Sequence, residues 1–117
     1  MKDMTICLTS APPSLNNNHG NSAAGGRFKK PRYKAWLTEA GYELKAQKIG
    51  KLEGHFGVEC EIGRKLSRAD LDNLAKPLID LLVKHKVVPD DANLTELAMR
   101  YTARADLKLR IYTTEAA

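Results

Sequence analysis

The sequence predicts a small single domain of the α+β class, in which a mixed β-sheet packs with helices in the order β-α-β-α-β-β. The chain has 117 residues, the length of one domain, so residues 1–117 are taken as a single unit. Short segments with apolar residues at alternate positions are interspersed with two longer segments whose apolar residues lie three or four apart. No internal repeat and no linker divides the chain.

The composition is typical of a soluble globular protein, with 43% hydrophobic and 28% charged residues. No apolar run approaches the roughly 20 residues of a membrane span. The segment from Met1 to Ser10 lacks the apolar core and cleavage site of a signal peptide. Cys7 and Cys60 form no CxxC pair, so we expect two buried thiols in a reducing cytoplasm. These features argue against a membrane protein and against a disulfide framework.

The N-terminal part of the chain predicts a strand and then a loop. Met4, Ile6 and Leu8 alternate with polar residues and predict a strand over residues 4–9, which the two following prolines must end. The polar run over residues 16–26 is rich in Asn, Gly and Ser and predicts a mobile surface loop.

Residues 33–49 predict the first helix, because aromatic and apolar residues recur there at helical spacing and Gly50 suits its end. Trp36 lies on the apolar stripe and should belong to the core. Gly41 weakens the middle of this helix by about 1 kcal/mol relative to alanine.

Three further segments predict strands. Apolar and acidic residues alternate over residues 55–62, so Glu59 and Glu61 should face solvent. Alternatively, one of the two could support a metal site by contacting a residue that binds the metal. Residues 94–102 and 107–113 predict the last two strands, and the short connection between them suits an antiparallel pair.

The second helix is predicted from about Asn73 to Lys86, with a leucine stripe that can pack on a core. Asn73 is a plausible N-cap. Pro77 would remove a hydrogen bond and clash if it lay deep inside a helix. The cap is therefore placed at Asn73 or slightly later.

The most informative stretch surrounds the start of that helix. Asp70 and Asp72 flank an apolar Leu71, so in an extended segment both carboxylates point to the same side. Asp72, Lys76 and Asp80 lie four residues apart and line one face of a helix. The stretch separates an acid-rich edge with one lysine from an apolar anchor, as a divalent-metal site requires.

A second source of carboxylates is the turn that carries Asp90 and Asp91. If this turn folds back to the start of the second helix, one of the two could join Asp70 and Asp72 in the set of oxygen ligands that Mg²⁺ prefers. Lys76 would then lie beside the ion as a fixed cation for the phosphate or for developing charge.

Each part of this arrangement also has a plainer interpretation. A D-x-D pair often supplies a helix cap and a surface charge, and two aspartates after a proline are most often a turn. Asp80 suits a helical ion pair with Lys76 better than a metal ligand. His19, His55 and His85 have no zinc spacing and are assigned no role.

Positive charge is concentrated in the first part of the chain. Residues 1–69 carry 12 basic and 6 acidic side chains, or +6, and residues 70–117 carry 7 basic and 8 acidic ones, or −1. Five basic residues form a cluster within eight positions: Arg27, Lys29, Lys30, Arg32 and Lys34. Phe28 and Tyr33 lie among them and suit either contact with unstacked bases or anchoring to the core. The cluster suggests a polyanionic partner, although a solvated surface explains the charge as well.

Taken together, these residues resemble the RusA family of Holliday junction resolvases. The matching pattern is Arg68-x-Asp70-x-Asp72-Asn73-x-x-Lys76-x-x-x-Asp80-x-Leu82, followed by Asp90-Asp91-Ala92, and the early Pro12-Pro13-Ser14-x-Asn16 is similar to the family's opening. The resemblance spans nearly the whole chain. It implies a small mixed α/β fold and a homodimer that cleaves four-way DNA junctions by paired symmetric nicks, with Mg²⁺ or Mn²⁺, in DNA recombination and repair. Such proteins are often encoded by prophages or phages, so it also implies a bacterial cytoplasm.

By position, the resemblance implies roles for individual residues. The metal-binding catalytic acids would be Asp70, Asp72 and Asp91, the essential cation Lys76, and the supporting acids Asp80 and Asp90. The DNA-binding residues would be Arg27, Lys29, Lys30, Arg32, Lys34 and Arg68.

Two alternatives stay open beside the junction-resolving endonuclease. The chain could be a non-catalytic branched-DNA-binding module whose acids serve as caps and turns, or a metal nuclease that acts on flaps, replication forks or RNA. A four-way junction is two-fold symmetric and therefore suits a two-fold dimer. Either the apolar face of the second helix or an edge strand could form that interface.

Overall fold

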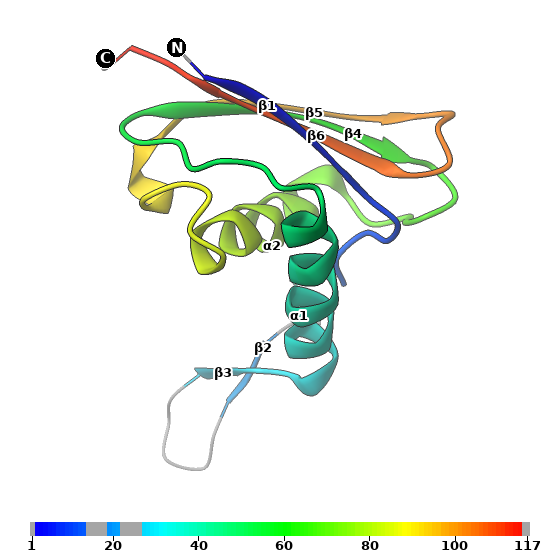
Figure 1. Cartoon of the computed structure of the whole chain (residues 1–117). Helices are drawn as coiled ribbons and strands as arrows, with labels where there is room; N and C mark the ends of the chain where they lie inside the picture. Colours follow the sequence, from blue (N-terminus) through cyan, green and yellow to red (C-terminus); the bar gives the residue numbers. More distant parts are fainter. Residues whose placement is uncertain (1, 14–18, 22–26, 116–117) are drawn as a thin grey trace.

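Two helices cover one face of a four-stranded sheet, and a short hairpin projects at the start of the first helix (Figure 1). Figure 1 draws a computed structural model, which describes residues 2–13, 19–21 and 27–115; for residues 19–21 and 27–29 the description covers the backbone alone. The elements are β1 (Asp3–Leu8), β2 (His19–Asn21), β3 (Arg27–Lys29), α1 (Pro31–Ala46), β4 (Phe56–Gly63), α2 (Leu71–Lys84), the 3-10 helix η2 (Asp91–Asn93), β5 (Leu94–Thr102) and β6 (Leu107–Thr113).

The predicted α+β class and the order β-α-β-α-β-β of the main elements are confirmed. The last two strands begin and end at the predicted residues. The hairpin of β2 and β3 is a correction, because the sequence predicts only a loop there. Residues 14–18 and 22–26 of that expected loop lie outside the described residues.

The sheet has the strand order β1-β6-β4-β5, in which β4 and β5 are parallel and the other neighbours are antiparallel. The prediction that β5 pairs with β6 is therefore wrong, because β4 lies between them. A crossover through α2 returns the chain parallel to β4. The connection to β6 then passes the end of β4, where the Gly63 N–H donates to the Asp106 carbonyl at 2.9 Å. A Cβ on Gly63 would lie 2.3 Å from the Arg104 carbonyl oxygen, so this crossing requires glycine.

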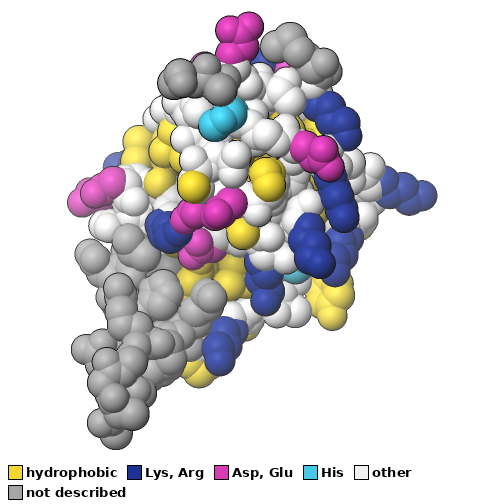
Figure 2. Space-filling view, turned by 90° about the vertical axis from the view of Figure 1, so that its left-hand side faces the viewer, with side chains coloured by type: hydrophobic (Ala, Val, Ile, Leu, Met, Phe, Trp, Pro, Cys, Tyr) yellow, Lys and Arg dark blue, Asp and Glu magenta, His cyan; other side chains and the backbone are white. Residues whose placement is uncertain are grey.

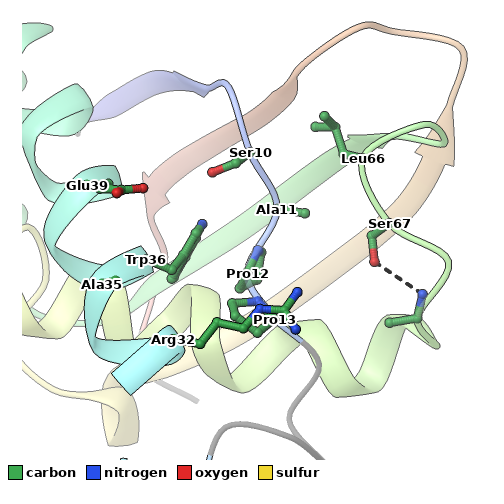
Figure 3. Close-up of a pocket in the computed structure, with 11 residues that line it drawn as sticks. Ser10, Ala11, Pro12, Pro13, Arg32, Ala35, Trp36, Glu39, Leu66 and Ser67 are labelled. Atoms are coloured by element: carbon green, nitrogen blue, oxygen red, sulfur yellow. Dashed lines mark hydrogen bonds between the residues drawn. The ribbon is translucent and has the colours of Figure 1, made fainter. Parts of the chain in front are cut away.

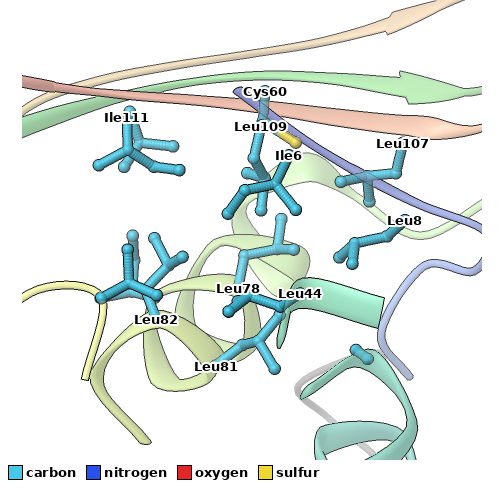
Figure 4. Close-up of a cluster of buried hydrophobic side chains, with 14 of the residues drawn as sticks. Ile6, Leu8, Leu44, Cys60, Leu78, Leu81, Leu82, Leu107, Leu109 and Ile111 are labelled. Atoms are coloured by element: carbon cyan, nitrogen blue, oxygen red, sulfur yellow. The ribbon is translucent and has the colours of Figure 1, made fainter. Parts of the chain in front are cut away.

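The core lies between the sheet and the two helices (Figure 4). The strands contribute Ile6, Leu8, Val58, Cys60, Ile62, Leu107, Leu109 and Ile111, and α2 contributes Leu74, Leu78, Leu81 and Leu82. Trp36 of α1 is buried, which confirms its predicted place in the core. Cys60 is buried and burial raises its pKa to about 12, so its thiol is inert, whereas Cys7 is exposed against expectation.

Charged pairs cover the opposite face of the sheet. Arg110 donates to Glu59 at 2.7 Å and to Asp3 at 2.7 Å, and Arg104 lies 3.9 Å from Glu61. Because side chains alternate along a strand, both glutamates of β4 point away from the helices. They face solvent as predicted, on the side of the sheet away from α2.

Both helices begin earlier than predicted. Pro31 lies in the first turn of α1, where its missing N–H has no helical partner to lose. Asp70, and not Asn73, is the N-cap of α2, so Pro77 lies inside the helix. There it removes the hydrogen bond that would reach the Asn73 carbonyl. Pro77 is buried, so packing of its ring offsets part of that cost.

Within the part of the chain that the structure describes, neither helix is long and apolar enough to span a membrane.

A candidate active site at the start of helix α2

Lys76 is the centre of a small charged group on the surface of α2. Its Nζ donates to Asp91 Oδ2 at 2.7 Å and lies 3.2 Å from Asp80 Oδ1. Lys76 and Asp91 are each about half exposed, at 49% and 48%, whereas the Asp80 side chain is 23% exposed. The predicted helical ion pair between Lys76 and Asp80 is therefore present.

The chain brings Asp91 to Lys76 by folding back after α2 ends. The Val87 N–H donates to the Leu82 carbonyl at 2.9 Å, and the Leu52 N–H donates to the Val87 carbonyl at 2.8 Å. Val87 and Val88 are buried, so the returning segment is held against the core. This return brings Asp91 to Lys76, as predicted for a turn that folds back along the second helix.

A buried tyrosine of α1 holds the other side of the group. The Tyr33 hydroxyl donates to Asp80 Oδ2 at 2.7 Å, and the Tyr33 side chain is fully buried. Burial raises the pKa of Tyr33 well above its ordinary value, and the bond to Asp80 raises it further, so the hydroxyl remains a donor at neutral pH. Of the two interpretations left open for Tyr33, anchoring to the core is the one observed.

The charges of Lys76 and Asp91 stabilise each other. The hydrogen bond to Asp91 raises the pKa of Lys76, and the same bond is the main reason why the pKa of Asp91 is lowered. Both groups therefore remain charged at neutral pH. A lysine held in this way presents a permanent cation at the surface of α2.

Asp70 and Asp72 lie at the N-terminus of α2 and are both exposed. Asp70 has the extended backbone of an N-cap, but its carboxylate makes no cap hydrogen bond. Asp72 is already in the first turn of α2 and not in an extended segment. The prediction that alternation along a strand points the Asp70 and Asp72 carboxylates to the same side therefore does not apply. Asp72 precedes Lys76 by one helical turn, which places it on the face that Asp91 approaches.

The donor types fit a hard divalent cation, because Mg²⁺ prefers carboxylate oxygens. Among the described residues, however, no group of three or more Asp, Glu, His or Cys side chains is close enough together to hold a metal ion. Lys76 is the group that engages Asp91. The arrangement is therefore a paired lysine and acid beside two further exposed carboxylates at the helix N-terminus.

Basic residues precede the site on the turn between β4 and α2. Arg64, Lys65 and Arg68 border an open hollow of about 610 Å³. The Arg64 guanidinium lies 4.3 Å from the centre of the Tyr101 ring, and the Tyr101 hydroxyl donates to the Ala69 carbonyl. These contacts tie the basic turn to β5 directly before Asp70.

The predicted basic cluster is only partly described. Lys30, Arg32 and Lys34 have described side chains, and none of them makes an ion pair with a described carboxylate. Arg27 and Lys29 lie on β3, where the description covers the backbone alone, and the side chain of Phe28 is likewise outside it.

A second hollow, of about 520 Å³, lies between residues 10–13, the first turns of α1 and residues 66–69 (Figure 3). Arg32 and Trp36 of α1 line it, and Ala69 lies at its other side. The buried indole Nε1 of Trp36 has no hydrogen-bond partner among the described residues. The hollow thus connects part of the basic cluster with the residue directly before Asp70.

The chain matches the family model described as endodeoxyribonuclease RusA over residues 10–112. This match covers most of the chain and includes the whole of the candidate site. No curated protein matches the chain significantly.

Proposed function

The chain belongs to the RusA endodeoxyribonuclease family, and on that premise we propose that it resolves four-way DNA junctions by paired, symmetric, metal-dependent nicks. The observation that carries the proposal is the Lys76–Asp91 pair, one helical turn from Asp72, because it joins a fixed cation of α2 to an acid of the returning segment. Such a group suits phosphodiester hydrolysis, which needs charge stabilisation at the phosphate.

We assign the metal ligands to Asp70, Asp72 and Asp91. A bound Mg²⁺ or Mn²⁺ ion would supply an activated water and neutralise phosphate charge. Asp80 and Tyr33 hold the Lys76 ammonium in place, so that it can contact the phosphate or the leaving oxygen. We assign a supporting role to Asp90, the residue directly before Asp91.

Arg68 and the basic cluster would contact the DNA backbone beside the cut. Arg32 lies on α1 and lines the hollow that reaches Ala69, and Arg68 lies on the turn before α2 and borders the other hollow. Phosphate contacts of this kind fix the position of DNA without reading its sequence. We place this activity in DNA recombination and repair in a bacterial cytoplasm, with a prophage or phage as the source of the gene.

We also propose that the working form is a homodimer joined along β5. The apolar face of α2 is buried in the core, which leaves the two edge strands as candidates. The free edge of β1 is covered, because the side chain of Gln47 bonds both the N–H and the carbonyl of Cys7. β5 carries no such cover among the described residues, and its Leu97 side chain is 45% exposed.

The first test is cleavage of an end-labelled four-way junction with Mg²⁺, Mn²⁺ or a chelator, with a linear duplex of matching sequence as control. The proposal predicts paired nicks on the junction alone, which depend on the metal. Asp70→Asn should still bind the junction, with a Kd within about two-fold of that of the unmodified protein. Its cutting rate should fall by about 100-fold or more. Cutting by Asp70→Asn at the unmodified rate would remove Asp70 from the mechanism.

A non-catalytic branched-DNA-binding module is the second candidate, and the lack of a closed acid cluster among the described residues favours it. It predicts tight junction binding without cutting at any metal concentration. Cutting of replication forks or flaps in preference to four-way junctions would instead indicate a nuclease with another branched substrate.

A further inference from the structure

Lysines gather where both helices end, about 24 Å along α1 from the predicted basic cluster. We define the lysine patch as Lys48, Lys51, Lys84 and Lys86, which are all exposed. Two of these lysines follow α1, one ends α2 and one follows it. The hydrogen bond from Leu52 to Val87 holds the two segments side by side.

The patch lysines have no ion-pair partner among the described carboxylates, whereas Lys76, Arg104 and Arg110 each have two. Lys51 and Lys86 border a hollow of about 410 Å³ together with a single acid, Glu53. Figure 2 shows one face of the molecule, on whose right-hand side Lys and Arg side chains gather with few Asp or Glu side chains among them. An unpaired group of like charges on one surface favours a polyanionic partner.

The backbone at two of these lysines is unusual. Lys48 has φ 53° and Lys86 has φ 59°, which is the left-handed region where a helix end ordinarily carries Gly or Asn. The helix dipole favours a cation near the C-terminus of each helix, but Lys45 in the last turn of α1 and Lys84 in the last turn of α2 already meet that preference. Fold stability therefore does not account for lysine at the two left-handed positions.

The patch continues from the candidate active site along the returning segment. Pro89 borders the same hollow as Lys51 and Lys86, and Asp90 and Asp91 follow it directly. Along α2, Lys84 lies about 12 Å from Lys76. That distance spans roughly three phosphates of one DNA strand along the duplex axis.

We propose that the lysine patch binds the phosphate backbone of the duplex arm that leaves the active site. This surface is separate from the basic cluster, and the inference rests on the proposed function. The lysine patch should bind a nucleic-acid backbone, because its side chains end in ammonium cations, which contact phosphates as point charges.

The test compares three double variants in binding to a labelled four-way junction over a range of salt concentrations. Lys48→Gly with Lys86→Gly removes two charges and also relieves the left-handed backbone. Lys48→Arg with Lys86→Arg keeps both charges. Lys108→Gln with Arg110→Gln is the control, because it removes two charges of β6 from the opposite face of the sheet.

The proposal predicts that the glycine variant binds the junction about 10-fold more weakly near 0.1 M salt, and that the slope of log K against log salt falls by about 1.8. Its urea midpoint should be equal to or higher than that of the unmodified protein, so weaker binding cannot come from unfolding. The arginine variant and the control should stay within about two-fold in Kd.

The outcomes separate this inference from the proposed function. If the unmodified protein binds the junction tightly and the glycine variant binds as well as the control, the patch is not a DNA surface, and the proposed function stands. If the unmodified protein binds neither junction nor duplex, the proposed function fails first.

Discussion

At the scale of single residues, the candidate site depends on a chain of contacts that begins in the core. Tyr33 donates to Asp80, Asp80 pairs with Lys76, and Lys76 pairs with Asp91. A long lysine side chain has much rotational freedom to lose when it is held in one place. Because the tyrosine is buried, it fixes Asp80 and so restricts where the ammonium can lie.

We therefore expect Tyr33→Phe to slow junction cutting by about 10-fold while the junction Kd stays within about two-fold. The ring still fills its buried place, but Asp80 loses the donor that orients it. Single-turnover cleavage at saturating protein measures the effect. Tyr42→Phe is the control, because Tyr42 lies on the same helix and is 70% exposed. Equal cutting by both variants would mean that the Tyr33 hydroxyl does not position Lys76.

Some of these contacts can be predicted from the sequence and others cannot. The Lys76–Asp80 pair follows from the spacing of four residues on a helix. The contact of Asp91 with Lys76 follows only if the chain folds back after α2, which a spacing cannot show. Tyr33 and Asp80 lie 47 positions apart, so their hydrogen bond depends on how α1 packs against α2.

At the scale of elements, the two helices meet through a glycine. A Cβ on Gly41 of α1 would lie 2.2 Å from His85 Nε2, and that nitrogen is 3.0 Å from the Leu37 carbonyl. The glycine that weakens α1 by helix propensity therefore makes room for the imidazole ring. Tertiary packing outweighs the local preference at this position.

Gly41→Ala should lower the free energy of unfolding by about 1 kcal/mol. Helix propensity would contribute about 1 kcal/mol in its favour, but overpacking against His85 costs about 1–3 kcal/mol. Urea unfolding measures the balance. In a His85→Ala background the clash is absent, and Gly41→Ala should then raise stability. A stabilising effect in both backgrounds would show that the ring moves aside without cost.

The sequence predicts where the helices and strands lie along the chain better than it predicts which strands pair. Alternation and helical spacing are local signals, and they identify both helices and all four strands of the main sheet. Strand pairing is not local: the crossover through α2 sets β5 beside β4, and the chain then passes the end of β4 at Gly63 to reach β6. The start of α2 is predicted too late because the argument from Pro77 neglects the packing of a buried ring.

At the scale of the whole molecule, the proposed homodimer depends on the edge of β5 that no described residue covers. An uncovered edge strand offers unpaired N–H and carbonyl groups to another chain. Two copies that pair β5 with β5 across a two-fold axis would satisfy both edges and set two candidate sites at a fixed separation. A single copy has one Lys76–Asp91 group, so paired cuts by a monomer would need two binding events.

If the proposed dimer forms along β5, Leu97→Lys should convert it to a monomer of 13.0 kDa in analytical ultracentrifugation, because two like charges would meet across the axis. On a supercoiled plasmid with an extruded cruciform, paired nicks release linear DNA, whereas unpaired nicks leave open circles. The variant should therefore shift the product from linear to open-circular DNA. Tyr42→Lys, which places the same charge at an exposed site on α1, should change neither result. If Leu97→Lys still sediments as a dimer, the interface lies elsewhere, and if the unmodified protein is a monomer that releases linear DNA, paired cutting needs no dimer.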